Sequence, residues 1–221
     1  MLGTIQSTFV PCDGDFEIFL PDSDRENNSS PSSHAGAGQL ASAETITAFP
    51  WDGGRPQECY DNVTYLVELL GGERVYGWAL ADMGPLSVVR QKQPPLYARW
   101  INHAVWRDGG GKLWEVTPRF EVGNLNRVAW SATRFVPDAQ AVFHSNEDGC
   151  WSQPAKYVAL RPEGERLVSL LCRAEVESDE GCRALLLRAA LAELARAGFT
   201  PKECRVETNG TRTNNIWLIV E

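Results

Sequence analysis

The sequence predicts an α+β fold, and three observations lead to this prediction. A helical pattern of apolar residues follows Cys59, a series of short strand-like segments runs from residue 74 to residue 136, and a longer helical pattern covers Ser178–Ala197. A tight turn between two of the strand-like segments favours antiparallel pairing. The expected architecture is therefore a cysteine-bearing helix packed on an antiparallel sheet, followed by a C-terminal α/β extension.

Changes in composition divide the chain into four segments. Residues 1–20 contain one strand-like piece, Asp15–Leu20, and residues 21–44 are rich in Ser, Asn, Gly and Pro. Such a composition has little to bury and is typical of a flexible linker or a disordered loop. Residues 45–138 form the predicted core, and residues 139–221 form a C-terminal α/β part that packs on it.

The first predicted helix opens at Cys59, after a loop containing two glycines and a proline. Gly71 and Gly72 supply its stop. Its apolar residues recur at steps of three and four: Val63, Leu66, Val67 and Leu70. A cysteine at a helix start differs from one inside an apolar run, because the helix N-terminus favours the thiolate.

The remaining elements follow from alternation and from turn residues. Strands are predicted over residues 74–81, 100–107, 112–117 and 127–136, with a proline-containing loop over 83–95. Asp108–Gly111 is a tight, glycine-rich connection. In the last block, 156–160 and 216–220 are short strands, and Ser178 is the expected cap of a helix that Gly198 ends.

Bulk composition excludes several classes of protein. The chain has 221 residues, 43% of them apolar, and a formal net charge of -8 with no basic cluster. This argues against nucleic acid or an anionic membrane surface as a partner. The six cysteines are scattered, no secretory signal is evident and no apolar run is long enough to span a bilayer, so a cytoplasmic protein is expected, or one delivered from the cytoplasm without a standard signal peptide.

Three residues of the core form a candidate site. His103 alone among three histidines falls in a predicted core strand, where alternation places Ile101, His103 and Val105 on one face and Asn102 and Ala104 on the other. The hairpin through Asp108–Gly111 returns a strand that carries Glu115. A carboxylate beside an imidazole fixes its tautomer and stabilises its charged form, so Glu115 is the predicted partner of His103.

These residues resemble a known group of enzymes. A helix-opening Cys59, the sequence His103-Ala-Val-Trp106 on a strand and the sequence Glu115-Val-Thr-Pro118 after a turn are similar to the core of papain-like and transglutaminase-like cysteine enzymes, which include bacterial protein-glutaminases and glutamine-deamidating effectors. The resemblance covers about Gln57 to Pro118. Transglutaminase-like members usually carry aspartate as the third residue, so Glu115 departs from the group by one methylene.

The resemblance implies a reaction and further site residues. Cys59, His103 and Glu115 would act as a triad in amide hydrolysis, deamidation or acyl transfer, with the Cys59 backbone N–H and the Gln57 side chain as oxyanion donors. Trp78, Trp106 and Trp114 would line a cleft, although packing in the core is the simpler role for them. The substrate would be a protein or a small amide, and no cofactor is implied.

Two other interpretations of the sequence stay open. The first is a catalytically inactive binding or regulatory module on the same fold, in which the C-terminal helix serves a partner. The second is a zinc site that uses Cys59, His103 and a carboxylate, which no short ligand spacing supports. We therefore assign no metal ligands, and the oligomeric state is not predicted.

Overall fold

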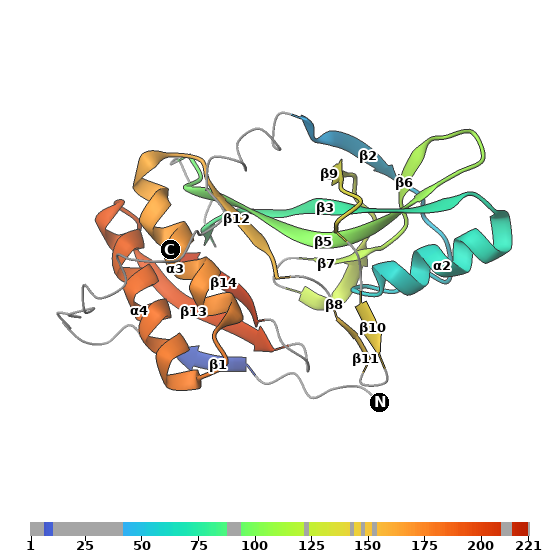
Figure 1. Ribbon diagram of the computed structural model, residues 1–221. Coiled ribbons are helices and arrows are strands. Elements are labelled where there is room, and N and C mark those ends of the chain that lie inside the picture. The colour runs from blue at the N-terminus through green and yellow to red at the C-terminus, as the bar shows by residue number, and fades with distance from the viewer. Residues whose placement is uncertain are drawn as a thin grey trace. The chain divides into compact units, whose positions relative to one another are not determined.

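The computed structural model describes residues 7–10, 42–87, 94–121, 124–141, 144–146, 149–151, 154–208 and 214–220 (Figure 1). It confirms a mixed α+β fold. The chain separates into two compact units, which we call the cysteine unit (Leu40–Leu80 and Trp100–Gln153) and the two-helix unit (Met1–Gln39, Ala81–Arg99 and Pro154–Glu221). The predicted strand at Asp15–Leu20 and nearly all of the predicted linker lie outside the described residues.

Strands and one helix make up the cysteine unit. The helix is α2 (Cys59–Leu70). The strands, of which β3 and β5 also extend into the two-helix unit, are β2 (Glu44–Ala48), β3 (Glu73–Gly84), β5 (Tyr97–Arg107), β6 (Leu113–Glu115), β7 (Arg119–Glu121), β8 (Asn124–Ala129), β9 (Thr133–Pro137), β10 (His144–Asn146) and β11 (Gly149–Trp151).

The main sheet of the cysteine unit closes on itself. Its described strands follow the order β5-β3-β9-β2-β6, and β6 pairs with β5 again. The predicted antiparallel sheet is in fact mixed, because β2 and β6 run parallel, with Thr47 opposite Trp114. The single strand predicted over residues 127–136 is also wrong. The chain leaves β8 after Ala129 and enters β9 at Thr133, and the Trp130 ring between them packs against Gly54.

The two faces of β5 divide as the alternation predicted. Ala104 and Trp106 belong to a buried cluster with Cys59, Val63 and Leu66 of α2, so the even-numbered face of β5 lies toward the helix. On the other face, Val105 joins a second buried cluster with residues of the neighbouring strands: Ile46, Ala79 and Phe135. Figure 1 shows α2 running along the sheet. The predicted helix of residues 59–70 is confirmed, and it ends at Gly71, whose φ of 74° suits glycine.

The two-helix unit has its own sheet and core. Its elements are β1 (Ser7–Val10), β4 (Leu86–Ser87), β12 (Lys156–Ala159), η2 (Pro162–Gly164), α3 (Glu165–Val176), α4 (Glu180–Arg196), β13 (Pro201–Thr208) and β14 (Asn214–Val220). The described sheet order is β1-β13-β14-β4. Apolar residues of α3 and α4, including Leu171 and Leu194, share a buried core with Leu218 of β14.

Sequence reasoning predicted α4 and β14 but missed α3 and β13. The cap of α4 also differs from the prediction. Asp179, not Ser178, is the N-cap, and its Oδ1 accepts the Cys182 backbone N–H at 2.7 Å. No described helix is long and apolar enough to cross a bilayer.

Candidate functional site

Cys59 is the first residue of α2, and its side chain is 7% exposed. The N-cap residue, Glu58, gives the helix no side-chain cap and instead forms a surface ion pair with Arg55 at 3.6 Å. The first-turn N–H groups of a helix have no partner within the helix. The sulfur of Cys59 therefore lies at a helix start whose amides Glu58 leaves uncapped, which favours negative charge there.

His103 and Glu115 form the most closely paired part of the site. His103 Nε2 lies 3.0 Å from Oε1 and 2.9 Å from Oε2 of Glu115. The two residues are 5% and 1% exposed, so their contact is shielded from water. Glu115 lies just beyond the last paired residues of β5 and β6, Trp106 and Trp114, and from there its side chain meets His103. The prediction that the hairpin brings these two residues together is confirmed.

The charge state of His103 follows from its neighbours. Burial lowers the pKa of the imidazole, but the Glu115 carboxylate and the adjacent Cys59, with a side-chain hydrogen bond to each, raise it to about 10. The ring is therefore protonated at neutral pH. Because Nε2 is engaged by Glu115, Nδ1 is the ring nitrogen left for Cys59. A protonated imidazole next to a cysteine favours the thiolate, the nucleophilic form.

The three residues are also brought together by packing. Cys59 lies in one buried cluster with Ala104, the residue after His103, and Val116, the residue after Glu115. On its other side the His103 ring meets Phe135 edge-on, with ring centroids 6.5 Å apart. The imidazole is thus held by a carboxylate and an aromatic ring, which restrict its rotation beside the cysteine.

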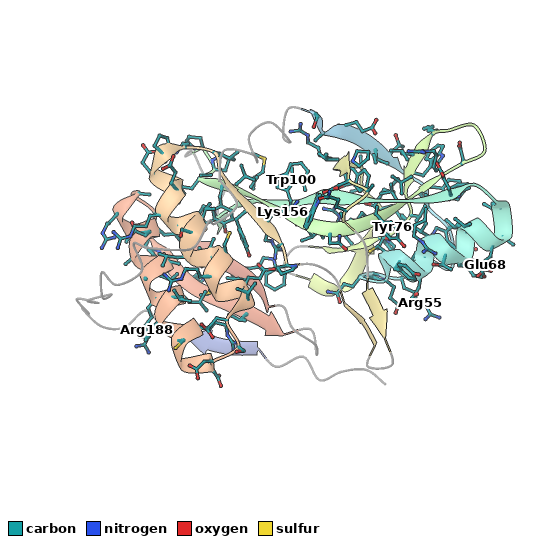
Figure 2. The ribbon with its side chains drawn as sticks, viewed as in Figure 1. Arg55, Glu68, Tyr76, Trp100, Lys156 and Arg188 are labelled. Atoms are coloured by element: carbon teal, nitrogen blue, oxygen red, sulfur yellow. The ribbon has the colours of Figure 1, made fainter. Side chains whose placement is uncertain are left out.

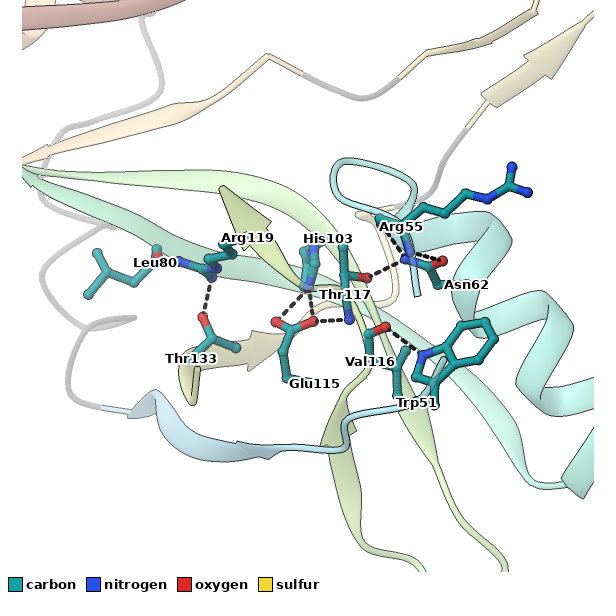
Figure 3. Close-up of polar contacts among 10 residues, drawn as sticks. All are labelled: Trp51, Arg55, Asn62, Leu80, His103, Glu115, Val116, Thr117, Arg119 and Thr133. Atoms are coloured by element: carbon teal, nitrogen blue, oxygen red, sulfur yellow. Dashed lines mark hydrogen bonds and ion pairs between the residues drawn. The ribbon is translucent and has the colours of Figure 1, made fainter. Parts of the chain in front are cut away.

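A polar network fastens the site from behind (Figure 3). Asn62, one turn after Cys59, accepts the Arg55 backbone N–H at 3.0 Å and donates to the Arg55 carbonyl at 2.7 Å. Its Nδ2 also donates to Thr117 Oγ1 at 3.2 Å, and the Thr117 backbone N–H donates to Glu115 Oε1 at 3.0 Å. Asn62 therefore connects the loop before the cysteine with the strand that carries the acid.

The entry segment before α2 is attached to the same strand. The Phe49 backbone N–H donates to the Glu115 carbonyl at 2.8 Å, and the Trp51 indole N–H donates to the Val116 carbonyl at 3.0 Å. Sequence reasoning missed Asn62, Thr117 and Trp51. Asn62 gave one usable signal, since a polar residue four positions from the buried Leu66 and next to Val63 falls on the apolar face of the helix.

The other predicted site residues occupy different environments. Gln57 is exposed and has a φ of +66°, which is unusual for a residue other than glycine. The Trp78 indole N–H donates to Asp138 Oδ2 at 2.8 Å, and the Trp106 indole N–H donates to the Gly71 carbonyl at 2.9 Å. Trp114 likewise donates to Asp108 Oδ2 at 2.8 Å. These three indoles are engaged within the protein.

A surface cavity of about 560 Å³ lies elsewhere in the cysteine unit. It is lined by β2 residues and by the β5–β6 hairpin, including Glu44, Arg107 and Lys112, and by none of the three site residues. Within the described part of the chain, no group of three His, Cys, Asp or Glu side chains has a geometry that would hold a metal ion.

The chain matches no protein-family model, no curated protein and no solved structure. What the site can do is therefore argued from its geometry. A thiol at a helix start, an imidazole that contacts it and a carboxylate that holds the imidazole are the parts of a nucleophilic triad.

Proposed function

We propose that this protein is a cysteine-dependent acyl-transfer enzyme of the papain-like and transglutaminase-like type, with Cys59 as nucleophile, His103 as proton carrier and Glu115 as the residue that orients and charges His103. The observation that carries the proposal is the contact of His103 Nε2 with both oxygens of the buried Glu115 while the same ring contacts Cys59. A buried histidine with a purely packing role does not need a charged partner on one side and a thiol on the other.

The first half of the reaction uses the charged pair. The Cys59 thiolate attacks the carbonyl carbon of an amide, and the C–N bond breaks as His103 gives its proton to the leaving amine or ammonia. A thioester on Cys59 remains. The backbone N–H of Cys59, at the uncapped helix start, is the natural donor to the oxygen that becomes negative in the intermediate.

The second half releases the acyl group. Water or an amine attacks the thioester, His103 removes its proton, and the C–S bond breaks to regenerate the charged pair. Glu115 stays ionised throughout and stabilises the imidazolium each time it forms. Hydrolysis of a peptide bond, deamidation of a glutamine side chain and transfer to an amine share these steps.

Alkylation of the native protein tests the proposal. On exposure alone, Cys172 and Cys182 should react with iodoacetamide before Cys59, because both are exposed and Cys59 is buried. We expect the opposite order near neutral pH, with the label located by mass spectrometry. His103→Gln should slow labelling of Cys59 at least about tenfold and leave the two exposed cysteines unchanged.

The exposed cysteines serve as internal controls for reagent and pH. If Cys59 labels no faster than they do, or if His103→Gln leaves its rate unchanged, the nucleophile assignment is wrong. The inactive binding module would then be the better description of the protein.

A further inference from the structure

Two buried polar side chains of β5 have no hydrogen-bond partner among the residues that the structure describes. Asn102 is 5% exposed and leaves both Nδ2 and Oδ1 without a partner, and Trp100 is 3% exposed and leaves its indole N–H without one. Leaving one buried polar atom unsatisfied is unfavourable by about 1–3 kcal/mol. Three such atoms on two residues of one strand call for an explanation.

Both residues lie on the face of β5 that meets α2. Trp100, Asn102, Ala104 and Trp106 alternate along that face, and the last two belong to the cluster that contains Cys59. The end of α2 is fixed at Trp106, whose indole N–H donates to the Gly71 carbonyl. Asn102 and Trp100 therefore lie toward the other end of the helix, where Cys59 begins it. Figure 2 labels Trp100 on the sheet.

Simple lengths agree with this placement. A helix of 12 residues is about 18 Å long, and four residues of a strand, from Trp106 to Asn102, span about 13 Å. The start of α2 thus comes level with the stretch of β5 that carries Asn102 and Trp100. Cys59 contacts His103, the residue after Asn102.

The unpaired atoms define a ligand by their chemistry. Asn102 Nδ2 and Trp100 Nε1 are donors, and Asn102 Oδ1 is an acceptor. A primary or secondary carboxamide offers the complementary set, because its oxygen accepts and its N–H donates. An ester or a thioester offers no donor for Oδ1. A site that leaves polar atoms unpaired without the right ligand discriminates strongly against ligands that lack the matching group.

We infer that Asn102 and Trp100 form the subsite that binds the carboxamide of the substrate beside Cys59, so that the natural substrate is an amide, such as a glutamine side chain or a peptide bond, and not an ester or thioester. This inference rests on the proposed function of Cys59. None of the three atoms is open to solvent, so the substrate reaches them only when a neighbouring side chain moves aside. The hydrogen bonds gained at Asn102 and Trp100 favour that movement for an amide alone.

Two thiol reagents separate amide recognition from thiol reactivity. Iodoacetamide carries a carboxamide and methyl methanethiosulfonate does not, so the ratio of their rates at Cys59 measures the subsite. Asn102→Leu should lower this ratio about tenfold while the thiosulfonate rate stays unchanged. The same variant should raise the unfolding temperature, because it replaces two unpaired polar atoms by apolar ones of similar volume.

A matched pair of tryptophan variants tests the donor at Trp100. Trp100→Phe should lower the ratio about threefold, because it removes one hydrogen bond to the substrate. Trp78→Phe removes the indole N–H that donates to Asp138 and should lower stability without changing the ratio. Equal effects of the two variants on the ratio would contradict the subsite.

A competition experiment on the unaltered protein needs no variant to fold. Butyramide should protect Cys59 from the thiosulfonate, and 2-pentanone, a carbonyl compound of the same size without an N–H, should not. Equal protection by both compounds, or an unchanged ratio in Asn102→Leu, overturns the amide subsite and leaves the triad standing. Slow labelling of Cys59 by both reagents overturns the triad and the subsite together.

Discussion

Asn62 Nδ2 lies 3.2 Å from Thr117 Oγ1, a contact between residues 55 positions apart that joins the helix of Cys59 to the strand of Glu115. The same side chain also bonds the backbone N–H and carbonyl of Arg55. Asn62 is thus a positioning residue: it touches neither Cys59 nor His103, yet it fixes the loop before the one and the acid behind the other.

Replacing Asn62 should therefore loosen the site and the fold together. Asn62→Ala leaves the Arg55 amide groups and the Thr117 hydroxyl without their partner, and we expect the free energy of unfolding to fall by about 1–3 kcal/mol in urea titrations. Labelling of Cys59 by iodoacetamide should slow as well. Asp61→Ala, at an exposed position of the same helix turn, is the matched control and should change neither quantity appreciably. A stability loss at Asn62 without slower labelling would limit its role to the fold.

Removing the charge of Glu115 should change the titration of His103. Glu115→Gln keeps the size of the side chain but removes the carboxylate, which is the largest contribution that raises the pKa of His103 to about 10. We expect that pKa to move down toward the ordinary histidine value, measured by NMR of the imidazole ring. Glu73→Gln, in the exposed ion pair with Arg107, supplies the control with the same change of charge. A His103 titration that is the same in both variants would mean that Glu115 does not set its charge.

The backbone at Gln57 should accept glycine better than its neighbour does. A residue other than glycine at φ +66° stores strain of about 1–2 kcal/mol, and Gln57→Gly relieves it at the expense of greater freedom in the unfolded chain. The free energy of unfolding should therefore stay equal or rise by up to about 1 kcal/mol. Glu58→Gly, at a φ of -102°, has no strain to relieve and should be destabilising by about 0.5–1 kcal/mol. Equal losses in both variants would show that the Gln57 conformation is unstrained.

Local patterns and long-range contacts differ in how far the sequence predicts them. Cys59 at a helix start and the two faces of β5 follow from spacing over a few residues, and so does the turn at Asp108, whose Oδ1 accepts the Gly110 and Lys112 backbone N–H groups. The Asn62–Thr117 contact depends on how α2 lies on the sheet, which no local pattern encodes. The missed helix α3 did carry a signal, because Leu167, Leu171 and Ala174 recur at steps of three and four.

The split of the predicted strand at residues 127–136 has a similar cause. The segment alternates well enough to be a single strand, but Trp130 packs against Gly54 in the loop before α2, and the chain leaves β8 there before it enters β9. A contact with a segment over seventy residues away thus overrides the local pattern. The same holds for the polar atoms of Asn102, whose lack of partners becomes evident only when the fold is complete.

In the two-helix unit, Glu175 should make stability depend on pH. Glu175 is 2% exposed, and burial raises its pKa to about 7, against the lowering effects of the Ala155 N–H, Tyr157 and Arg99. Asp82 adds to the raising, and Oε1 accepts the Ala155 N–H at 2.7 Å. In the unfolded chain the same carboxyl group titrates near 4.5.

The sign of this dependence follows from those two values. Below pH 4.5 the carboxyl group is neutral in both states, and as pH rises through about 7 the folded state must carry a buried carboxylate. Folding stability from this group is thus present below pH 4.5 and lost toward pH 7, by roughly 3 kcal/mol in total. Glu175→Gln keeps an oxygen for the Ala155 N–H and has no charge to bury. Its free energy of unfolding, relative to the unaltered protein, should rise between pH 4.5 and 7 and be flat on either side. Glu165→Gln, at an exposed position at the start of α3, should show no such rise in urea titrations over the same range. Parallel curves for both variants would mean that Glu175 ionises as readily in the folded protein as in the unfolded chain.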